Sequence, residues 1–159
     1  MPTIVPKKEL LRMKGWKSSP SEYFEIDQER INRFAEATED LQFIHVDAER
    51  AAQTPFGATV AHGFLTLSLL PRLLKDISVI PVGTTMAVNY GLNNVRFIEP
   101  VRSGSRVRAR LEILDVVEKH GGRVLVTAEA VVSIERQGDR EGGDRPALIA
   151  ETLTLYVTS

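Results

Sequence analysis

The chain of 159 residues contains no cysteine. This absence excludes disulfide bonds, thiolate metal ligands and a cysteine nucleophile. Histidine is scarce, with three copies, so few imidazoles are available for acid–base chemistry. No apolar run approaches the roughly 20 residues that a membrane-spanning helix needs, and residues 1–8 lack the apolar segment of a secretory signal. We therefore expect a cytoplasmic protein that does not act in a membrane.

The charged residues nearly balance, with 20 basic and 21 acidic side chains and a formal net charge of −1. This balance gives no electrostatic attraction to nucleic acid or to an anionic membrane, so we expect neither as a partner. Hydrophobic residues make up 43% of the chain, and the length suits one domain over residues 1–159 with its own core. Glycine and charged residues cluster at 137–145, which predicts an exposed hairpin connection within that domain.

Two helices are predicted in the first third of the chain. Asp27 is suited to cap a helix that runs to Thr38. The residues of its apolar face recur at positions i, i+3, i+4 and i+7: Ile31, Phe34, Ala35 and Thr38. Asp47 is placed to cap a second, short helix through Ala52, which the sequence Thr-Pro-Phe-Gly at 54–57 then breaks.

A third helix is predicted after Gly63. Residues 64–70 are apolar on nearly every side, and Pro71 kinks or ends the helix. A helix without a polar face has to be enclosed by other structure.

Most of the chain beyond residue 85 has the pattern of β-strands. Residues 106–113 alternate between charged and apolar side chains, which is typical of a half-buried strand whose arginines Arg106, Arg108 and Arg110 face solvent. The sequence His-Gly-Gly at 120–122 predicts a hairpin turn, in which His120 is solvated. Further strands are predicted at 86–90, 93–98, 124–134 and 148–157. One buried helix against several antiparallel strands belongs to the α+β class.

One part of the chain brings together an acid, an imidazole and a glycine. Segment 37–47 contains Asp40 and His45, and segment 56–65 contains Gly63 at the entrance of the apolar helix. An aspartate and a neutral histidine can together hold and deprotonate a water, and N–H groups at a helix N-terminus can stabilise an oxyanion. These groups are the ones needed to add water to, or remove it from, a double bond conjugated to a carbonyl.

The spacing of five between Asp40 and His45 is poor for a shared site on a regular helix, which turns about 100° per residue. The two side chains meet at one water only if the backbone between them is irregular. The alternative is that Asp40 ends the loop after the first helix while His45 packs beside Ile44. Gly63 has a similar alternative, because glycine occurs at helix starts for conformational reasons alone.

These segments resemble the MaoC-like dehydratases, the R-specific enoyl-CoA hydratases, whose signature is approximately A-x-[ST]-G-D-x-N-P-I-H-x-D followed by F-G-x-x-[IV]-A-H-G. Segment 91–104 resembles the family's downstream strand, G-x-x-x-V-R-F-x-x-P-V-x-x-G. The resemblance implies a hot-dog fold, an antiparallel sheet wrapped around a long central helix. It also implies catalytic roles for Asp40 and His45, an oxyanion role for the N–H of Gly63, and supporting roles for Gln42 and His62.

The chain departs from this signature at three positions. Glu39 stands where the family usually has glycine, Gln42 where it often has asparagine, and Phe43 where it often has proline. A glutamine followed by an aromatic residue and Ile-His-Val-Asp is similar to the nodulation-protein-N-like members of the family. Glu39 places a second carboxylate beside Asp40, and the two charges would repel strongly if both were shielded from water.

The resemblance implies the reversible hydration of trans-2-enoyl-CoA to (R)-3-hydroxyacyl-CoA in a homodimer. The reaction changes no net oxidation state, so no metal or redox cofactor is expected. Whether Asp40 or His45 is the base stays open. His62 is interpreted as a structural hydrogen-bonding residue, with a catalytic role as the alternative. Four cationic residues are candidates for the coenzyme A phosphates, without a choice among them: Arg72, Lys75, Arg96 and Arg102.

Two other functions fit parts of this pattern. A hot-dog thioesterase also presents an acyl thioester to a helix N-terminus, but it usually has a carboxylate on or near the central helix, and residues 64–70 contain none. A non-catalytic acyl-CoA-binding or partner subunit of a dehydratase pair would be expected to lack the Asp40 and His45 pair.

Overall fold

The computed structural model describes residues 1–135 and 143–159. The helices are α1 (Lys7–Leu10), α2 (Gln28–Thr38), α3 (Phe43–Val46), α4 (Ala48–Ala52), α5 (Gly63–Ser68) and α6 (Leu70–Leu74). The strands are β1 (Thr3–Val5), β2 (Phe24–Ile26), β3 (Val79–Pro81), β4 (Thr84–Phe97), β5 (Ser105–Lys119), β6 (Arg123–Ile134) and β7 (Arg145–Thr158). Most of the connection expected at 137–145 lies outside the described residues.

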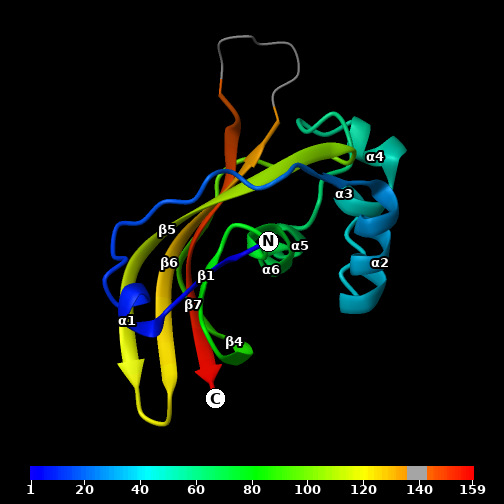
Figure 1. Ribbon diagram of the computed structural model, residues 1–159. Helices are drawn as coiled ribbons and strands as arrows, with labels where there is room; N and C mark the ends of the chain where they lie inside the picture. The colour runs from blue at the N-terminus through cyan, green and yellow to red at the C-terminus, as the bar shows by residue number, and fades with distance from the viewer. Residues whose placement is uncertain (136–142) are drawn as a thin grey trace.

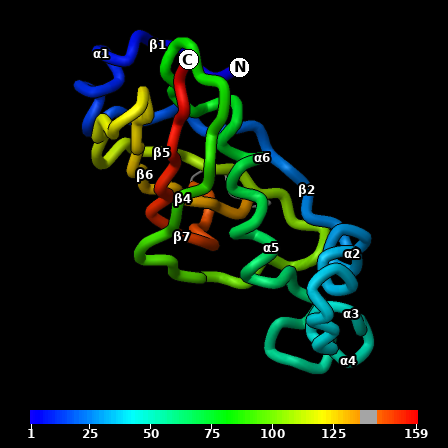
Figure 2. The backbone as a smooth tube through the Cα atoms, turned by 90° about the horizontal axis from the view of Figure 1, so that it is seen from below, coloured from blue at the N-terminus to red at the C-terminus, as the bar shows by residue number. Residues whose placement is uncertain are grey.

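Five strands form one antiparallel sheet in the order β2-β5-β6-β7-β4. The sheet curls around α5 and α6, which lie on its concave side (Figure 1). Strands β1 and β3 form a separate parallel pair. Helices α2, α3 and α4 gather at one end of the molecule beside α5, as both views show (Figures 1 and 2). The α+β class predicted from the sequence is confirmed.

The four long strands follow the predicted pattern with one exception, whereas the short strands β1, β2 and β3 were not predicted. Gly121 and Gly122 have φ angles of 72° and 71°, the left-handed conformations that a tight hairpin turn between β5 and β6 requires. The segments 86–90 and 93–98, predicted as two strands, are parts of the single strand β4. Its pairing with β7 shifts register three times, and two of these shifts, between Asn89 and Gly91 and between Asn93 and Arg96, lie at the apparent break, where Asn94 has a φ of 51°. The break is therefore a pair of irregularities within one strand.

The central helical segment is shorter than predicted. Instead of one long helix there are two short ones, because α5 ends at Ser68 and α6 begins at Leu70. Pro71 lies in the first turn of α6, where its missing N–H leaves no helical hydrogen bond unmade. The enclosure expected of this segment is also incomplete, since the side chain of Phe64 is 67% exposed.

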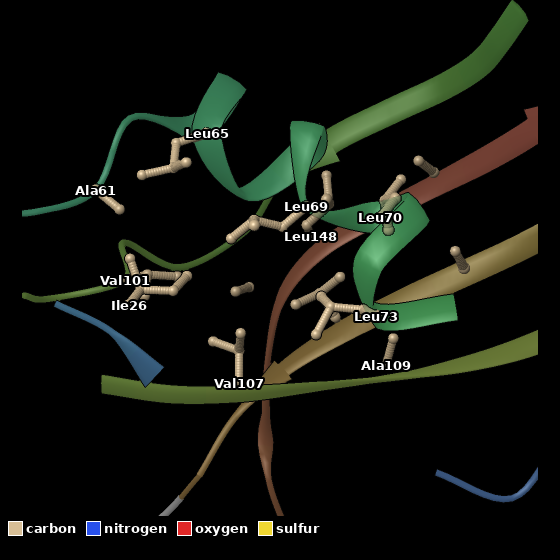
Figure 3. Packing of buried hydrophobic residues seen from close by; sticks show 14 of the residues in the cluster. Ile26, Ala61, Leu65, Leu69, Leu70, Leu73, Val101, Val107, Ala109 and Leu148 are labelled. Carbon is tan, nitrogen blue, oxygen red and sulfur yellow. The ribbon is translucent and has the colours of Figure 1, made fainter. Parts of the chain in front are cut away.

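The main core lies between the central helices and the concave face of the sheet (Figure 3). Leu65, Leu69 and Leu73 from the helices pack with Val107 and other inward side chains of the sheet. Alternation along β5 works as predicted, with Val107 and Ala109 fully buried and the arginines outside. This packing fixes the start of α5, which carries part of the candidate site.

Arg106 and Arg110 on β5 are exposed, as predicted, whereas Arg108 is partly buried. Arg106 pairs with Glu135 at 3.1 Å, and Arg108 pairs with Asp144. Both guanidinium groups lie over the ring of Tyr23, at 4.8 and 4.5 Å from its centroid. In the described ranges no helix has the length and apolar character needed to cross a membrane.

Candidate active site

Asp40 lies directly after α2, at the point where the chain turns toward α3. Asp27 caps the start of α2 by accepting a hydrogen bond from the N–H of Arg30 at 2.8 Å, as predicted. The helix ends at Glu39, whose φ of 59° is left-handed. Glycine adopts this conformation without strain, which explains the glycine of the family signature. Glu39 is exposed and the Asp40 side chain is 51% exposed, so the two carboxylates are not shielded from water.

His45 lies in the short helix α3 and is 7% exposed. Its Nδ1 lies 2.7 Å from the carbonyl oxygen of Val60. A carbonyl only accepts hydrogen bonds, so Nδ1 carries the proton, and in the neutral ring the lone pair is on Nε2. Burial is the main cause that lowers the pKa of His45 below 6.5, and His62 adds to it, while the Val60 hydrogen bond and the Asp40 carboxylate oppose it. His45 is therefore a neutral base near pH 7 with a fixed tautomer.

His62 lies at the N-cap position of α5 and is 2% exposed. Its Nε2 donates to the carbonyl oxygen of Asp40 at 3.0 Å and lies 4.0 Å from the Asp40 carboxylate. Its ring stacks on that of His45, with centroids 3.8 Å apart and an interplanar angle of 22°. A ring nitrogen of each histidine and a carboxylate oxygen of Asp40 all lie within 4.8 Å of one another. The irregular backbone between α2 and α3 thus brings Asp40 and His45 together.

Gln42, predicted as a supporting residue, contacts His45 through its backbone. It occupies the N-cap position of α3 without a side-chain capping bond, and its carbonyl accepts from the N–H of His45 at 3.0 Å. Two residues not predicted from the sequence hold this region through their side chains. Gln28 donates to the carbonyl of His45 at 2.7 Å, and the buried Thr59 hydroxyl donates to Gln28 at 2.5 Å. Both residues lie far from His45 in sequence, so no spacing signal indicated them.

Gly63 begins α5, as predicted. A Cβ at this position would lie 3.0 Å from two ring carbons of Phe97 on β4, a tight contact that requires the ring to shift. Phe64 meets the same ring edge-on at 6.0 Å between centroids. The packing of α5 on β4 therefore favours glycine at the helix start, which the sequence did not indicate.

Asp40, His45 and His62 are also, within the described part of the chain, the group whose ligand atoms lie close enough to hold a metal ion. One nitrogen of each imidazole already contacts a backbone carbonyl, from Val60 or from Asp40. This arrangement leaves the Nε2 of His45 and the Asp40 carboxylate to bind a water.

The four cationic candidates for phosphate binding lie in different surroundings. Arg72 lies over the ring of Phe24 at 5.1 Å, and Lys75 pairs with Asp76 at 3.8 Å. Arg96 donates to the carbonyl of the preceding residue. Arg102 forms an isolated β-bridge with Val60, whose carbonyl accepts the hydrogen bond from His45, so the backbone of Arg102 lies beside the site.

Comparison with known proteins identifies the class. Residues 12–136 match the family model described as a MaoC like domain. The chain is 45% identical over 157 residues to 3-hydroxyacyl-thioester dehydratase Z of Mycobacterium tuberculosis, with 99% of each chain covered. It is 47% identical over 145 residues to Nodulation protein N of Rhizobium leguminosarum, with 89% of this chain and 84% of that one covered. A solved MaoC-like dehydratase from Rhodospirillum rubrum has a TM-score of 0.73 at 18% identity, with 98% of both chains covered.

The fold and the dehydratase relatives define an enzyme, a hydro-lyase built on a hot-dog fold. The chain belongs to the MaoC-like family. The resemblance drawn from the three sequence segments, including the similarity to nodulation protein N, is thereby confirmed.

Proposed function

We propose that this enzyme catalyses the reversible (R)-specific hydration of trans-2-enoyl-CoA to (R)-3-hydroxyacyl-CoA. The observation that carries the proposal is the pairing of the Asp40 carboxylate with a buried, neutral His45 whose Nε2 is free. The name of the Mycobacterium tuberculosis relative, a 3-hydroxyacyl-thioester dehydratase, supports a thioester substrate.

In the proposed mechanism, Asp40 and His45 hold one water between them. The Nε2 of His45 takes a proton from this water as its oxygen bonds to C3 of the substrate, and the electron pair of the double bond moves toward the thioester carbonyl. The N–H of Gly63 stabilises the oxygen that becomes negative. A proton returned to C2 completes the addition, and the reverse sequence eliminates water. The tautomer of His45 favours it as the base, with Asp40 orienting the water.

We also propose that the enzyme is a homodimer. Strand β4 is an edge of the sheet and is exposed along most of its length. Its side of the molecule carries large exposed apolar side chains: Phe64, Met86, Val88, Tyr90, Leu92, Phe97 and Ile98. A second copy that pairs along β4 would cover this edge and these side chains.

Loss of absorbance of the conjugated enoyl thioester, measured over a ladder of acyl lengths, tests the reaction. Chiral analysis of the product is expected to give the (R) alcohol, and a predominantly (S) product would contradict the proposal. Release of coenzyme A, detected with a thiol reagent, would instead indicate a thioesterase. Binding without turnover would indicate a non-catalytic partner subunit.

A further inference from the structure

His62 contacts both residues of the proposed catalytic pair, through the backbone carbonyl of Asp40 and the ring of His45. It donates from Nε2 to the carbonyl oxygen of Asp40 and stacks its ring on that of His45. We infer that His62 is a positioning residue, which holds Asp40 and His45 at one water without exchanging a proton itself. This inference rests on the proposed function, because it concerns the same site.

Of the two proposed catalytic residues, Asp40 has fewer contacts that fix its position. It lies in the exposed turn after the left-handed Glu39. Within the described part of the chain, its one hydrogen bond outside regular secondary structure is the one that its carbonyl accepts from His62. His45 is fixed more firmly, because α3 holds its backbone and the Val60 carbonyl holds its Nδ1. Stacking of the His62 ring is a second restraint on His45, and the hydrogen bond from its Nε2 is the main restraint on Asp40.

The protonation of His62 favours a positioning role over a second acid–base role. Since a carbonyl accepts its Nε2–H, the remaining lone pair of the neutral ring is on Nδ1. This Nδ1 is buried and has no hydrogen-bond partner in the described structure. Phe34 also packs against the ring, with centroids 5.0 Å apart and an interplanar angle of 58°. The titratable groups that contact His62 are Asp40 and His45.

Two substitutions separate the two contacts. His62→Gln keeps an amide donor near the position of Nε2 and loses the stacking, whereas His62→Phe keeps the stacking and loses the donor. We expect His62→Phe to lower kcat about 100-fold, the scale of a misplacement of roughly 1 Å, while His62→Gln loses about tenfold or less. The control is His120→Gln in the exposed turn between β5 and β6, which should leave kcat unchanged.

A measurement on the substrate-free protein tests the inference independently of activity. The Asp40 carboxylate raises the pKa of His45, so Asp40→Asn should lower that pKa, measured by NMR titration of the imidazole C–H signals. If His62 holds the pair together, Asp40→Asn should have little effect on the pKa of His45 in a His62→Phe background and its full effect in a His62→Gln background. The chain has three histidines, which makes the signals simple to assign by substitution.

The inference would be overturned if Asp40→Asn lowered the pKa of His45 by the same amount with and without His62→Phe. Asp40 and His45 would then lie close together without the help of His62. If His62→Phe does not fold, His62→Asn replaces it, since its amide nitrogen takes the position of Nδ1 and does not reach the Asp40 carbonyl. A wild-type protein without hydratase activity would contradict the proposed function, and the NMR comparison would still decide the role of His62.

Discussion

At the scale of single residues, the site combines two side chains in different surroundings. His45 is buried with its Nδ1 bound to a carbonyl, and Asp40 stands half exposed at the end of a helix. Burial keeps the imidazole neutral, and the hydrogen bond from Nδ1 to the Val60 carbonyl leaves its lone pair on Nε2. Exposure leaves the carboxylate free to bind water from the solvent. This division suits a site in which His45 moves the proton and Asp40 orients the water.

Replacement of either residue should remove most of the activity. Asp40→Asn or His45→Gln should each lower kcat by roughly 10²–10⁴, the usual contribution of a general acid or base. The double variant should be little worse than the worse single one, because residues that act as a unit are not additive. Steady-state kinetics of enoyl thioester hydration provides the measurement, and circular dichroism checks that the variants fold. Near-normal hydration by His45→Gln would mean that the base is another residue.

The activity should respond to acid according to the pKa of His45. Because burial lowers this pKa below 6.5, the neutral base persists as the pH falls through 6.5. The acid limb of kcat/KM should therefore have its midpoint below pH 6.5, and that limb should be absent from the residual activity of His45→Gln. The unfolded chain takes up the proton first, so His45 should also reduce the stability of the fold as the pH falls below 6.5. An acid limb centred above pH 6.5 would contradict this assignment.

The sequence motifs were sufficient to predict that Asp40 and His45 lie close together and that Gly63 begins a helix. They did not indicate Gln28 or Thr59, whose hydrogen bonds to the site cross 17 and 31 residues of chain. Contacts of this kind depend on how α2 packs against the following segment. Local patterns carry no information about that packing.

At the scale of secondary structure, the end of α2 decides where Asp40 stands. Its last turn leads into Glu39 in a left-handed conformation, which costs an ordinary residue roughly 1–2 kcal/mol. From the sequence alone, Glu39 mattered only if it and Asp40 were both shielded from water. Glu39 is exposed, and its left-handed φ is a conformational feature that the sequence did not reveal.

Glu39→Gly should therefore stabilise the protein by about 1 kcal/mol, because glycine adopts this φ without strain. Urea unfolding followed by circular dichroism measures the change. The matched control is Glu36→Gly, an exposed position within α2, which should destabilise by about 1 kcal/mol. A destabilising Glu39→Gly would show that the glutamate side chain has a stabilising contact of its own.

The start of α5 depends on β4 in a similar way. Gly63→Ala would push a methyl group against the ring of Phe97, so it should destabilise by about 1–3 kcal/mol and lower kcat by displacing the helix start. Phe97→Leu in the same chain should restore part of the stability. Gly143→Ala is the control, since nothing lies within 4 Å of a Cβ there and the residue lies outside β4. Urea unfolding and kinetics of the single variant, the double variant and the control check this order of stabilities.

At the scale of the whole molecule, the described chain leaves the β4 edge of its sheet uncovered. The sequence predicted an apolar helix that other structure must enclose, and the sheet encloses one face of it. Phe64 on the other face remains 67% exposed, next to the open edge of β4. The alternation of residues along a strand predicts which face of the strand is buried. It does not predict which strand lies at an edge of the sheet. The order of strands, and thus the position of β4, came from the structure.

Covering this edge with a second copy should be necessary for a stable, active enzyme. Light scattering at micromolar concentration should give twice the chain mass of 17.7 kDa. Leu92→Glu, in β4, should shift the protein toward the monomer and lower activity, because the charge would be buried in the interface. Val117→Glu, an exposed apolar position on β5, is the control and should leave the dimer intact. A fully active monomer would contradict the homodimer, and a requirement for a second, different chain would point to a mixed complex.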